Sequence, residues 1–294
     1  MNNNKLNRRQ FCRISSLAGL GVSTLGTMTL CAGNMQNQMK LGLVTYQWGK
    51  DWDLPRLIKN CESIGLAAVE LRTEHAHKVE PSLSAAERKE VKKRFSDSKV
   101  TCVGYGSNQE FHNPDPKKLR EQIEGTFELI KLCHDIGATG VKVKPNTLPP
   151  DVPREKTIEQ IGMSLNEVGK FASDYGQLIR VEVHGPITQE IPNMKAIFEY
   201  VDQSNVKICW NSNPTDLNPP GLDANFDMVK KWIGDTVHIN RFTTGDYPFR
   251  KLFSLLSKIN YKGWILLEES IQVEDRIAAL KECKKVFDEM MSNL

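Results

Sequence analysis

Four side chains with metal-binding chemistry stand at the ends of four consecutive apolar runs. They are Glu182, Asn211, His238 and Glu268. Two carboxylates, one imidazole and one amide oxygen are suitable donors for one divalent ion, Mn, Mg, Co or Zn. A carboxylate beside such an ion can also move a proton on a carbon next to a carbonyl group. Any one of these residues alone would be an ordinary structural polar group. The ordered set predicts a metal centre in which Glu182 and Glu268 are catalytic.

Short runs rich in Val, Ile and Leu alternate with helical periods between residues 39 and 290. The strand-like runs are 41–46, 67–71, 100–105, 141–144, 179–184, 206–211, 236–240 and 264–268. The helical periods are 54–63, 85–96, 116–136, 155–175, 194–201, 225–233, 249–259 and 273–290. This alternation predicts one α/β domain over 39–290, a (β/α)8 TIM barrel. An open doubly wound sheet is the alternative, but no glycine-rich phosphate loop follows the first run.

Side chains alternate between the two faces of a strand, which indicates which residues point into the barrel. In the run 179–184 the apolar residues share one face, and Arg180, Glu182 and His184 share the other. Buried charges need partners. Glu70, Arg180 and Lys142, low in the barrel, are therefore predicted to form an ion-pair layer. The polar groups at the C-terminal mouth are predicted to form the active site, because barrel enzymes place it there.

Further polar and aromatic residues near the strand ends are candidate substrate contacts. Lys144 ends the fourth run. It is predicted to bind an acidic group or donate a proton, or else to form a salt bridge with Glu182 or Glu70. Tyr46 and Trp48 are predicted to form an apolar wall for the ligand, with core packing as the alternative. The other candidates are Lys142, His75, His77, His112, His184, Asn213, Asn240 and Arg241, the last as an anion clamp.

The first 33 residues have the features of an export signal. The segment NRRQFCR at 7–13 resembles the twin-arginine signature, and residues 14–30 form an uncharged, weakly apolar stretch. That stretch is too polar and too short for a comfortable transmembrane helix. Small residues at 31–33 offer a cleavage point. The pattern predicts a signal peptide over 1–33 and a periplasmic mature protein with no membrane span. A lipid anchor on Cys31 is the alternative.

The charge balance of the chain excludes a class of partners. Residues 1–33 contain four basic side chains and no acidic one, and the rest of the chain contains 35 basic and 36 acidic side chains. A surface with balanced charge does not favour non-specific binding to nucleic acid. The sequence therefore predicts a small-molecule partner and no nucleic acid, and it leaves a homo-oligomer open.

Three segments carry a family resemblance. They are VEVH at 181–184, VHIN at 237–240 and YKGWILLE at 261–268. In strand order and spacing, over roughly residues 39–290, the chain resembles the xylose isomerase-like TIM-barrel family of the sugar phosphate isomerase/epimerase type. The resemblance implies that Glu, Asp, His and Glu side chains hold one divalent metal ion. Glu182, His238 and Glu268 match three of these positions, and His184 matches a histidine that contacts the substrate.

The chain departs from this pattern at the third metal ligand. Asn211 stands where the family has Asp, and Pro214 stands where a His often follows. Asn240 also replaces an Asp. An amide oxygen still binds Mg²⁺ or Mn²⁺, but it carries no charge. We therefore expect weaker metal binding, or a different choice of metal, at this site.

The resemblance implies a sugar substrate and a metal-dependent isomerase or epimerase that removes a proton α to a carbonyl through an enediolate. The same proton abstraction supports elimination, so a lyase or hydratase acting on keto-sugars or keto-glycosides is an alternative. Asn211 and Asn240 motivate a second alternative, a sugar-binding barrel without catalysis. DNA-repair endonucleases share this barrel, but their metal clusters need more His and Asp residues than this chain offers.

Overall fold

The computed structural model describes residues 39–243 and 245–294. The predicted signal peptide at 1–33, including Cys31, lies outside these residues. Within the described part of the chain, no helix is both long enough and apolar enough to cross a membrane.

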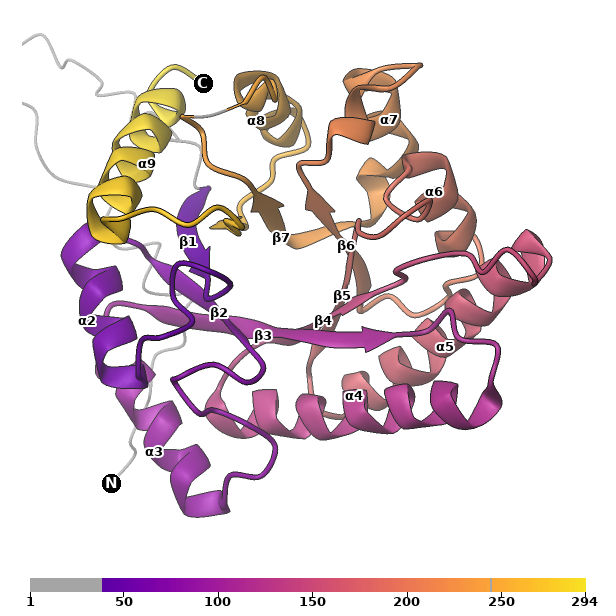
Figure 1. The fold of residues 1–294 in the computed structure, drawn as a ribbon, viewed down its shortest axis with the longest axis horizontal. Helices are drawn as coiled ribbons and strands as arrows, with labels where there is room; N and C mark the ends of the chain where they lie inside the picture. Colours follow the sequence, from indigo (N-terminus) through magenta and orange to yellow (C-terminus); the bar gives the residue numbers. More distant parts are fainter. Residues whose placement is uncertain (1–38, 244) are drawn as a thin grey trace, which may run out of the picture. The chain divides into compact units, whose positions relative to one another are not determined.

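The strands close into a ring. In the described residues, eight parallel strands pair in the order β1 to β8, and β8 pairs back with β1. They are β1 (Lys40–Val44), β2 (Ala68–Arg72), β3 (Thr101–Glu110), β4 (Gly140–Lys144), β5 (Leu178–Glu182), β6 (Val206–Asn211), β7 (Ile233–Ile239) and β8 (Trp264–Leu267). The predicted TIM barrel is confirmed, and the open sheet is excluded (Figure 1).

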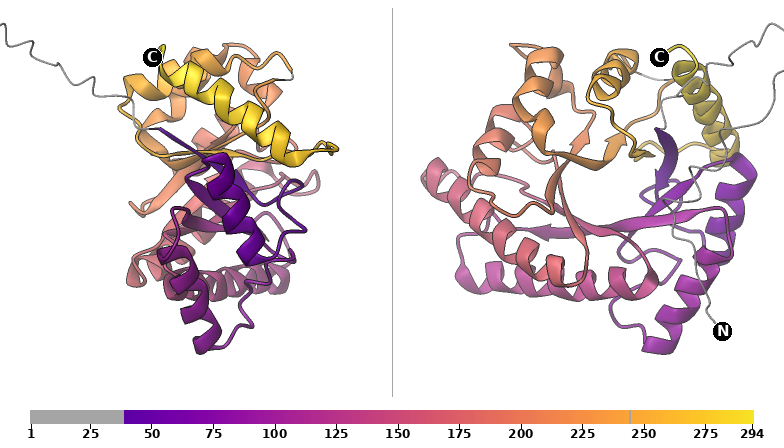
Figure 2. Two further views of the ribbon diagram at one scale, coloured as in Figure 1. Left: turned by 90° about the vertical axis from the view of Figure 1, so that its left-hand side faces the viewer. Right: turned by 180° about the vertical axis from the view of Figure 1, so that it is seen from behind.

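The helices lie outside the ring of strands (Figures 1 and 2). They are α2 (Leu54–Ile64), α3 (Ala85–Ser96), α4 (Pro116–Ile136), α5 (Arg154–Asp174), α6 (Ile191–Phe198), α7 (Leu222–Val229), α8 (Phe249–Lys258) and α9 (Arg276–Met291). Short 3-10 turns, η1 (Pro214–Leu217) and η2 (Lys230–Trp232), flank α7. The buried side chains of each helix pack on the apolar outer face of the strands, as in α2, where Leu57 and Cys61 are fully buried.

Local signals explain where several helices begin and end. In α2 and α4 an aspartate caps the first turn and a glycine in the left-handed conformation, Gly65 or Gly137, ends the helix. Helix α8 ends at Lys258, five residues before Gly263, so this glycine is not a helix cap. Gly263 instead lies where a Cβ atom would come within 2.3 Å of the Asp235 carbonyl oxygen.

Several predicted boundaries are shifted. β3 runs to Glu110 rather than to residue 105, with a register shift against β4 after Gly106. Helices α6 and α7 begin at Ile191 and Leu222, earlier than predicted, and α9 begins later, at Arg276. Asp275 caps α9 by accepting a hydrogen bond from the backbone N–H of Ala278 at 2.9 Å, so that helix begins where its capping residue stands.

Glycines make room for charged side chains inside the barrel. A Cβ atom at Gly104 would lie 2.3 Å from Nη1 of Arg180, and one at Gly106 would lie 2.6 Å from Oε1 of Glu70. Both glycines lie on β3. The interior of a TIM barrel is usually filled by branched apolar side chains. In this chain, the missing side chains on β3 leave that volume to a guanidinium and a carboxylate.

The buried charges are paired, but not as the predicted layer of Glu70, Arg180 and Lys142. Arg180 donates from Nε and Nη2 to the carboxylate of Asp235, at 2.8 Å each. Lys142 pairs with Glu182, and Glu70 faces His238. The prediction of a mutual ion-pair layer is wrong, because the stagger of the strands places each charge nearer to a partner on another strand.

Candidate metal centre and active site

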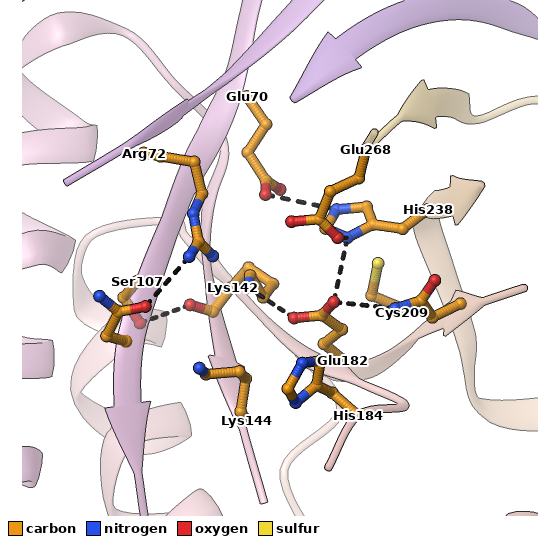
Figure 3. A network of polar contacts seen from close by, with 12 residues as sticks. Glu70, Arg72, Ser107, Lys142, Lys144, Glu182, His184, Cys209, His238 and Glu268 are labelled. Carbon is orange, nitrogen blue, oxygen red and sulfur yellow. Dashed lines mark hydrogen bonds and ion pairs between the residues drawn. The ribbon is translucent and has the colours of Figure 1, made fainter. Parts of the chain in front are cut away.

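Three predicted ligands converge at the C-terminal end of the barrel. Glu182 ends β5, His238 lies on β7, and Glu268 directly follows β8. One donor atom of each lies within 4.8 Å of the other two. Nδ1 of His238 is 3.1 Å from Oε2 of Glu268 and 3.4 Å from Oε1 of Glu182 (Figure 3). Donor atoms this close together, from one imidazole and two carboxylates, suit a shared divalent cation.

Asn211 lies beside this cluster. Its Nδ2 donates a hydrogen bond to Oε1 of Glu182 at 3.0 Å. Rotation of the amide by half a turn puts Oδ1 in the place of Nδ2, beside the carboxylate of Glu182, where an amide oxygen could serve as a fourth ligand. The donor set therefore fits one divalent ion of the Mn, Mg, Co or Zn type. With two carboxylates instead of three, the site carries one negative charge fewer than the ligand set that the family resemblance implies.

Glu70 stands behind His238. Its Oε1 is 3.3 Å from Nε2 of His238, and both side chains are fully buried. Burial raises the pKa of Glu70, but the nearby His238, Lys142 and Arg180 more than offset this, and the pKa lies below its usual range. An ionised Glu70 this close to Nε2 favours the tautomer that carries its proton on Nε2, which leaves the Nδ1 lone pair directed at Glu182 and Glu268. The alternation along β2 predicted that Glu70 points inward, but not this role.

Lys142 anchors Glu182. Its Nζ donates to Oε2 of Glu182 at 2.5 Å, and both side chains are buried. Burial raises the pKa of Glu182, but the ammonium of Lys142 and the imidazole of His238 outweigh it, and the pKa lies well below its usual range. The sequence allowed a salt bridge between Lys144 and Glu182. In the structure, Lys142 forms the salt bridge with Glu182. Lys144 instead lies 3.5 Å from Oε1 of Glu110.

A cavity of about 740 Å³ opens above the cluster, within the usual range for small-molecule sites. It is lined by Tyr46, Arg72, Lys144, Glu182, His184, Gly185, Pro186, Gln189, Asn211, Asn213, Asn240, Glu268 and Ser270. The structure thus brings five predicted substrate contacts to the cavity: Tyr46, Lys144, His184, Asn213 and Asn240. Sequence reasoning missed Arg72, Gln189 and Ser270. For Arg72 a signal existed, since it shares a strand face with Glu70.

Other predicted substrate contacts are not among the lining residues, because the structure engages them elsewhere. Trp48 is fully buried, and its Nε1 donates to the carbonyl of Ile271 at 2.8 Å. Arg241 lies over the Trp48 ring, 5.8 Å from its centroid, and 3.9 Å from Glu269. Trp48 and Arg241 therefore pack against each other, and neither is among the residues that line the cavity.

The histidines predicted to contact the substrate in the second and third strand loops also point elsewhere. Both ring nitrogens of His77 bind backbone, the carbonyl of Arg72 at 2.9 Å and the N–H of Val79 at 3.0 Å. Nδ1 of His75 lies 3.0 Å from Oγ1 of Thr45. Burial lowers the pKa of both histidines to about 4, so they are neutral near pH 7. His112 lies 3.6 Å from Glu110 and does not line the cavity.

His184 is held at the cavity by the neighbouring loop. Its Nδ1 lies 3.1 Å from Oδ1 of Asn146. The next residue, Gly185, has a φ angle of 90°, and a Cβ atom there would lie 1.8 Å from the Asn146 carbonyl oxygen. Only glycine allows this close approach of the two loops. Burial lowers the pKa of His184, which favours a neutral imidazole at the mouth.

Asp216, which the sequence analysis did not single out, is buried and connects two segments at the C-terminal end of the barrel. Oδ2 of Asp216 accepts a hydrogen bond from the Tyr247 hydroxyl at 2.6 Å and one from the backbone N–H of Asn213 at 3.1 Å. Trp210 donates from Nε1 to the Tyr247 oxygen at 3.2 Å. Asp216 therefore ties the segment after β6 to the segment before α8. Burial raises its pKa to about 8.

This pKa predicts a pH-dependent stability. Between about pH 4 and about pH 8, folded Asp216 keeps a proton that the unfolded chain has released, so the free energy of unfolding falls as pH rises, by at most about 1.4 kcal/mol per pH unit. Asp216→Asn is expected to remove this slope. Urea unfolding between about pH 5 and about pH 8 measures it, with the exposed Asp227→Asn as control. Equal slopes in the wild type and in Asp216→Asn would contradict the prediction.

Comparisons with known proteins agree with this architecture. Residues 58–286 match the family profile described as xylose isomerase-like TIM barrel. The fold is similar to 3-keto-D-glucoside 4-epimerase YcjR of E. coli, with TM-score 0.72, 15% identity, and coverage of 85% of this chain and 99% of that one. It is also similar to a zinc-bound IolI protein, with TM-score 0.71, 19% identity, and coverage of 87% and 99%.

A third similar structure is D-psicose 3-epimerase of Clostridium cellulolyticum H10 with D-tagatose, with TM-score 0.72, 17% identity, and coverage of 87% of this chain and 99% of that one. At these identities the likeness concerns the fold. The family match rests on the profile, which spans well over half of the chain and includes β3 to β8. The chain therefore belongs to the xylose isomerase-like TIM-barrel family.

Proposed function

We propose that this protein is a sugar isomerase or epimerase that depends on a divalent metal ion and moves a proton on the carbon next to a carbonyl. The observation that carries the proposal is the convergence of Glu182, His238 and Glu268 beneath the cavity. Structures with the same fold include epimerases of a 3-keto-glucoside and of psicose, and one holds zinc. These neighbours support a sugar substrate and a metal cofactor.

The proposed mechanism uses two carboxylates that reach one space from different strands. When bound, a divalent ion would polarise the sugar carbonyl and acidify the adjacent C–H group. Glu182, kept ionised by Lys142, takes the proton from carbon as general base, and Glu268, which enters this step protonated, gives its proton to the opposite face as general acid, so that the two carboxyl groups exchange proton states in each turnover. Protonation of the same carbon inverts its configuration. Protonation of the former carbonyl carbon, with the adjacent hydroxyl proton passing to the former carbonyl oxygen, isomerises the sugar. His184, held by Asn146, is placed to hydrogen-bond a sugar hydroxyl.

The test is solvent exchange on ketoses in D₂O. Protein purified without chelator is analysed for metal and then incubated with D-fructose, D-psicose or a 3-keto-glucoside, and NMR follows deuterium at the carbons next to the carbonyl. Metal-dependent exchange with sugar products supports the proposal. Exchange with loss of a β-substituent would instead identify a lyase. Binding of these sugars without exchange and without metal would instead indicate a sugar-binding barrel that lacks catalytic activity.

The neutral side chain of Asn211, as the fourth ligand, leads to a prediction about metal affinity. Asn211→Asp adds a negative charge beside Glu182, so we expect Mn²⁺ to bind about tenfold more tightly or better. Calorimetric titration of chelator-treated protein measures the affinity. The matched control is Asn240→Asp, which adds the same charge at another residue that lines the cavity. If the two variants bind Mn²⁺ alike, Asn211 is not a ligand.

A further inference from the structure

Arg72 is a positioned guanidinium on the cavity wall. It ends β2 and lines the cavity. Its Nη2 donates to Oδ1 of Asn108 at 3.1 Å, and its guanidinium carbon lies 5.6 Å from the centroid of the Tyr46 ring. A Cβ atom at Gly106 would lie 2.8 Å from Cδ of Arg72. Because Gly106 has no side chain, the side chain of Arg72 can pass over β3. Tyr46 and Asn108 then orient the planar guanidinium group.

No carboxylate neutralises this guanidinium among the described residues; the contacts of Arg72 are with the amide of Asn108 and the ring of Tyr46. Arg72 also does not belong to the proton-transfer group or the metal cluster. A pre-oriented arginine with unused donors is the side chain best suited to bind a carboxylate or a phosphate through two parallel hydrogen bonds.

Lys144 adds a second cation to the same cavity. It ends β4 and is largely buried, with 12% of its side chain exposed. Its ion-pair partner is Glu110, at 3.5 Å, and Glu110 also lies 3.6 Å from Nδ1 of His112. Burial, followed by repulsion from Lys142, lowers the pKa of Lys144. Glu110, with 27% of its side chain exposed, balances the charge of Lys144 but not that of Arg72, so a net positive charge is left on this wall.

The charges of the cavity are separated by side. Figure 3 shows Arg72 and Lys144 on the left and Glu268 with His238 on the right, and Glu182 lies between them in contact with Lys142. Lys142 is neutralised by Glu182, so it adds little to the field in the cavity. A ligand whose carbonyl end lies at Glu182 and Glu268 would extend its other end toward Arg72 and Lys144.

We propose that Arg72 and Lys144 form a subsite for an anionic group of the sugar, a carboxylate or a phosphate ester, at the end remote from the reacting carbonyl. The orientation of the sugar in this subsite rests on the proposed function. The protein is then selective for acidic ketoses over neutral ones. The planar fork of Arg72 supplies paired hydrogen bonds, and Lys144 supplies a second positive charge beside it.

Three ketoses that differ only at C6 test this subsite. They are D-fructose, with a neutral CH₂OH group, D-fructuronate, with a carboxylate, and D-fructose 6-phosphate. Calorimetric titration of the metal-loaded full chain measures the apparent affinity for each ketose. At low ionic strength we expect at least one acidic ketose to bind about tenfold more tightly than fructose. Preference for fructuronate identifies a carboxylate site, and preference for the phosphate ester identifies a phosphate site.

The variants locate the selectivity. Arg72→Gln is expected to remove most of the preference, measured as the ratio of the affinity for the acidic ketose to that for fructose, and Lys144→Gln is expected to reduce this ratio in the same way. Arg72→Lys keeps the charge without the fork and is expected to restore only part of it. The control is Lys285→Gln on α9, whose side chain is 78% exposed. Thermal unfolding of each variant shows whether it is folded.

The affinity and exchange results together distinguish failure of the anion subsite from failure of the proposed function. Equal affinity of the wild type for all three ketoses overturns the anion subsite, whatever the exchange assay shows. A preference that survives in Arg72→Gln and Lys144→Gln also overturns it, since the charge then lies elsewhere. Tight, Arg72-dependent binding of an acidic ketose without deuterium exchange supports the subsite and counts against isomerase chemistry alone.

Discussion

Glu182→Gln is expected to lower the rate of α-proton exchange by about 10²- to 10⁴-fold, the usual contribution of a general base. Glutamine keeps the shape of the side chain, and its amide oxygen can still accept a hydrogen bond from Lys142. It cannot accept a proton from carbon. NMR of ketose deuteration in D₂O measures the rate. The matched control is Glu274→Gln, an exposed position before α9, which is expected to exchange at the wild-type rate.

This substitution also leaves the buried Lys142 ammonium without a charged partner, so a loss of exchange could arise from a loss of stability. The double variant Lys142→Met with Glu182→Gln removes both charges, and we expect it to regain stability because no unpaired charge stays buried. If Glu182 is the base, exchange stays absent in the stable double variant. A folded Glu182→Gln protein that exchanges within about threefold of the wild type assigns the base to Glu268 instead.

The largest effect on stability is expected at the opposite end of the barrel. Asp235→Ala removes the carboxylate that accepts two hydrogen bonds from Arg180 at 2.8 Å. Arg180 is fully buried, and its other hydrogen bonds go to the neutral oxygens of Val103 and Thr139. A buried charge without its partner costs about 3–5 kcal/mol. Urea unfolding is expected to show a loss of this size in the free energy of unfolding.

An exposed ion pair serves as the control for this prediction. Lys251 and Asp223 are also 2.8 Å apart, but about half of each side chain is exposed. Asp223→Ala is expected to lower the free energy of unfolding far less than Asp235→Ala, since water solvates the remaining charge. Arg180→Met combined with Asp235→Ala is expected to recover part of the loss. If Asp235→Ala is as mild as Asp223→Ala, then another group, such as Glu70, balances Arg180.

Local patterns predicted the fold and the ligand types because they depend on short spacings. Alternation within 179–184 indicated that Arg180 and Glu182 point inward, and both are buried inside the barrel. Helix α4 was predicted with its observed ends, Pro116 and Ile136, because a capping aspartate, a proline and a final glycine mark them. Boundaries without such signals, such as the start of α7, were shifted by several residues.

The sequence by itself determined the barrel, the order of the polar strand ends, and the replacement of an expected aspartate by Asn211. Residues 1–33 add a prediction of export. Only the tertiary structure decided which charges meet: Lys142 rather than Lys144 contacts Glu182, Glu70 stands behind His238, and Arg72 shares a wall with Lys144. These contacts depend on the stagger between strands and on the space left by glycines in β3, and both are set when the barrel closes, because strands far apart in the sequence then become neighbours.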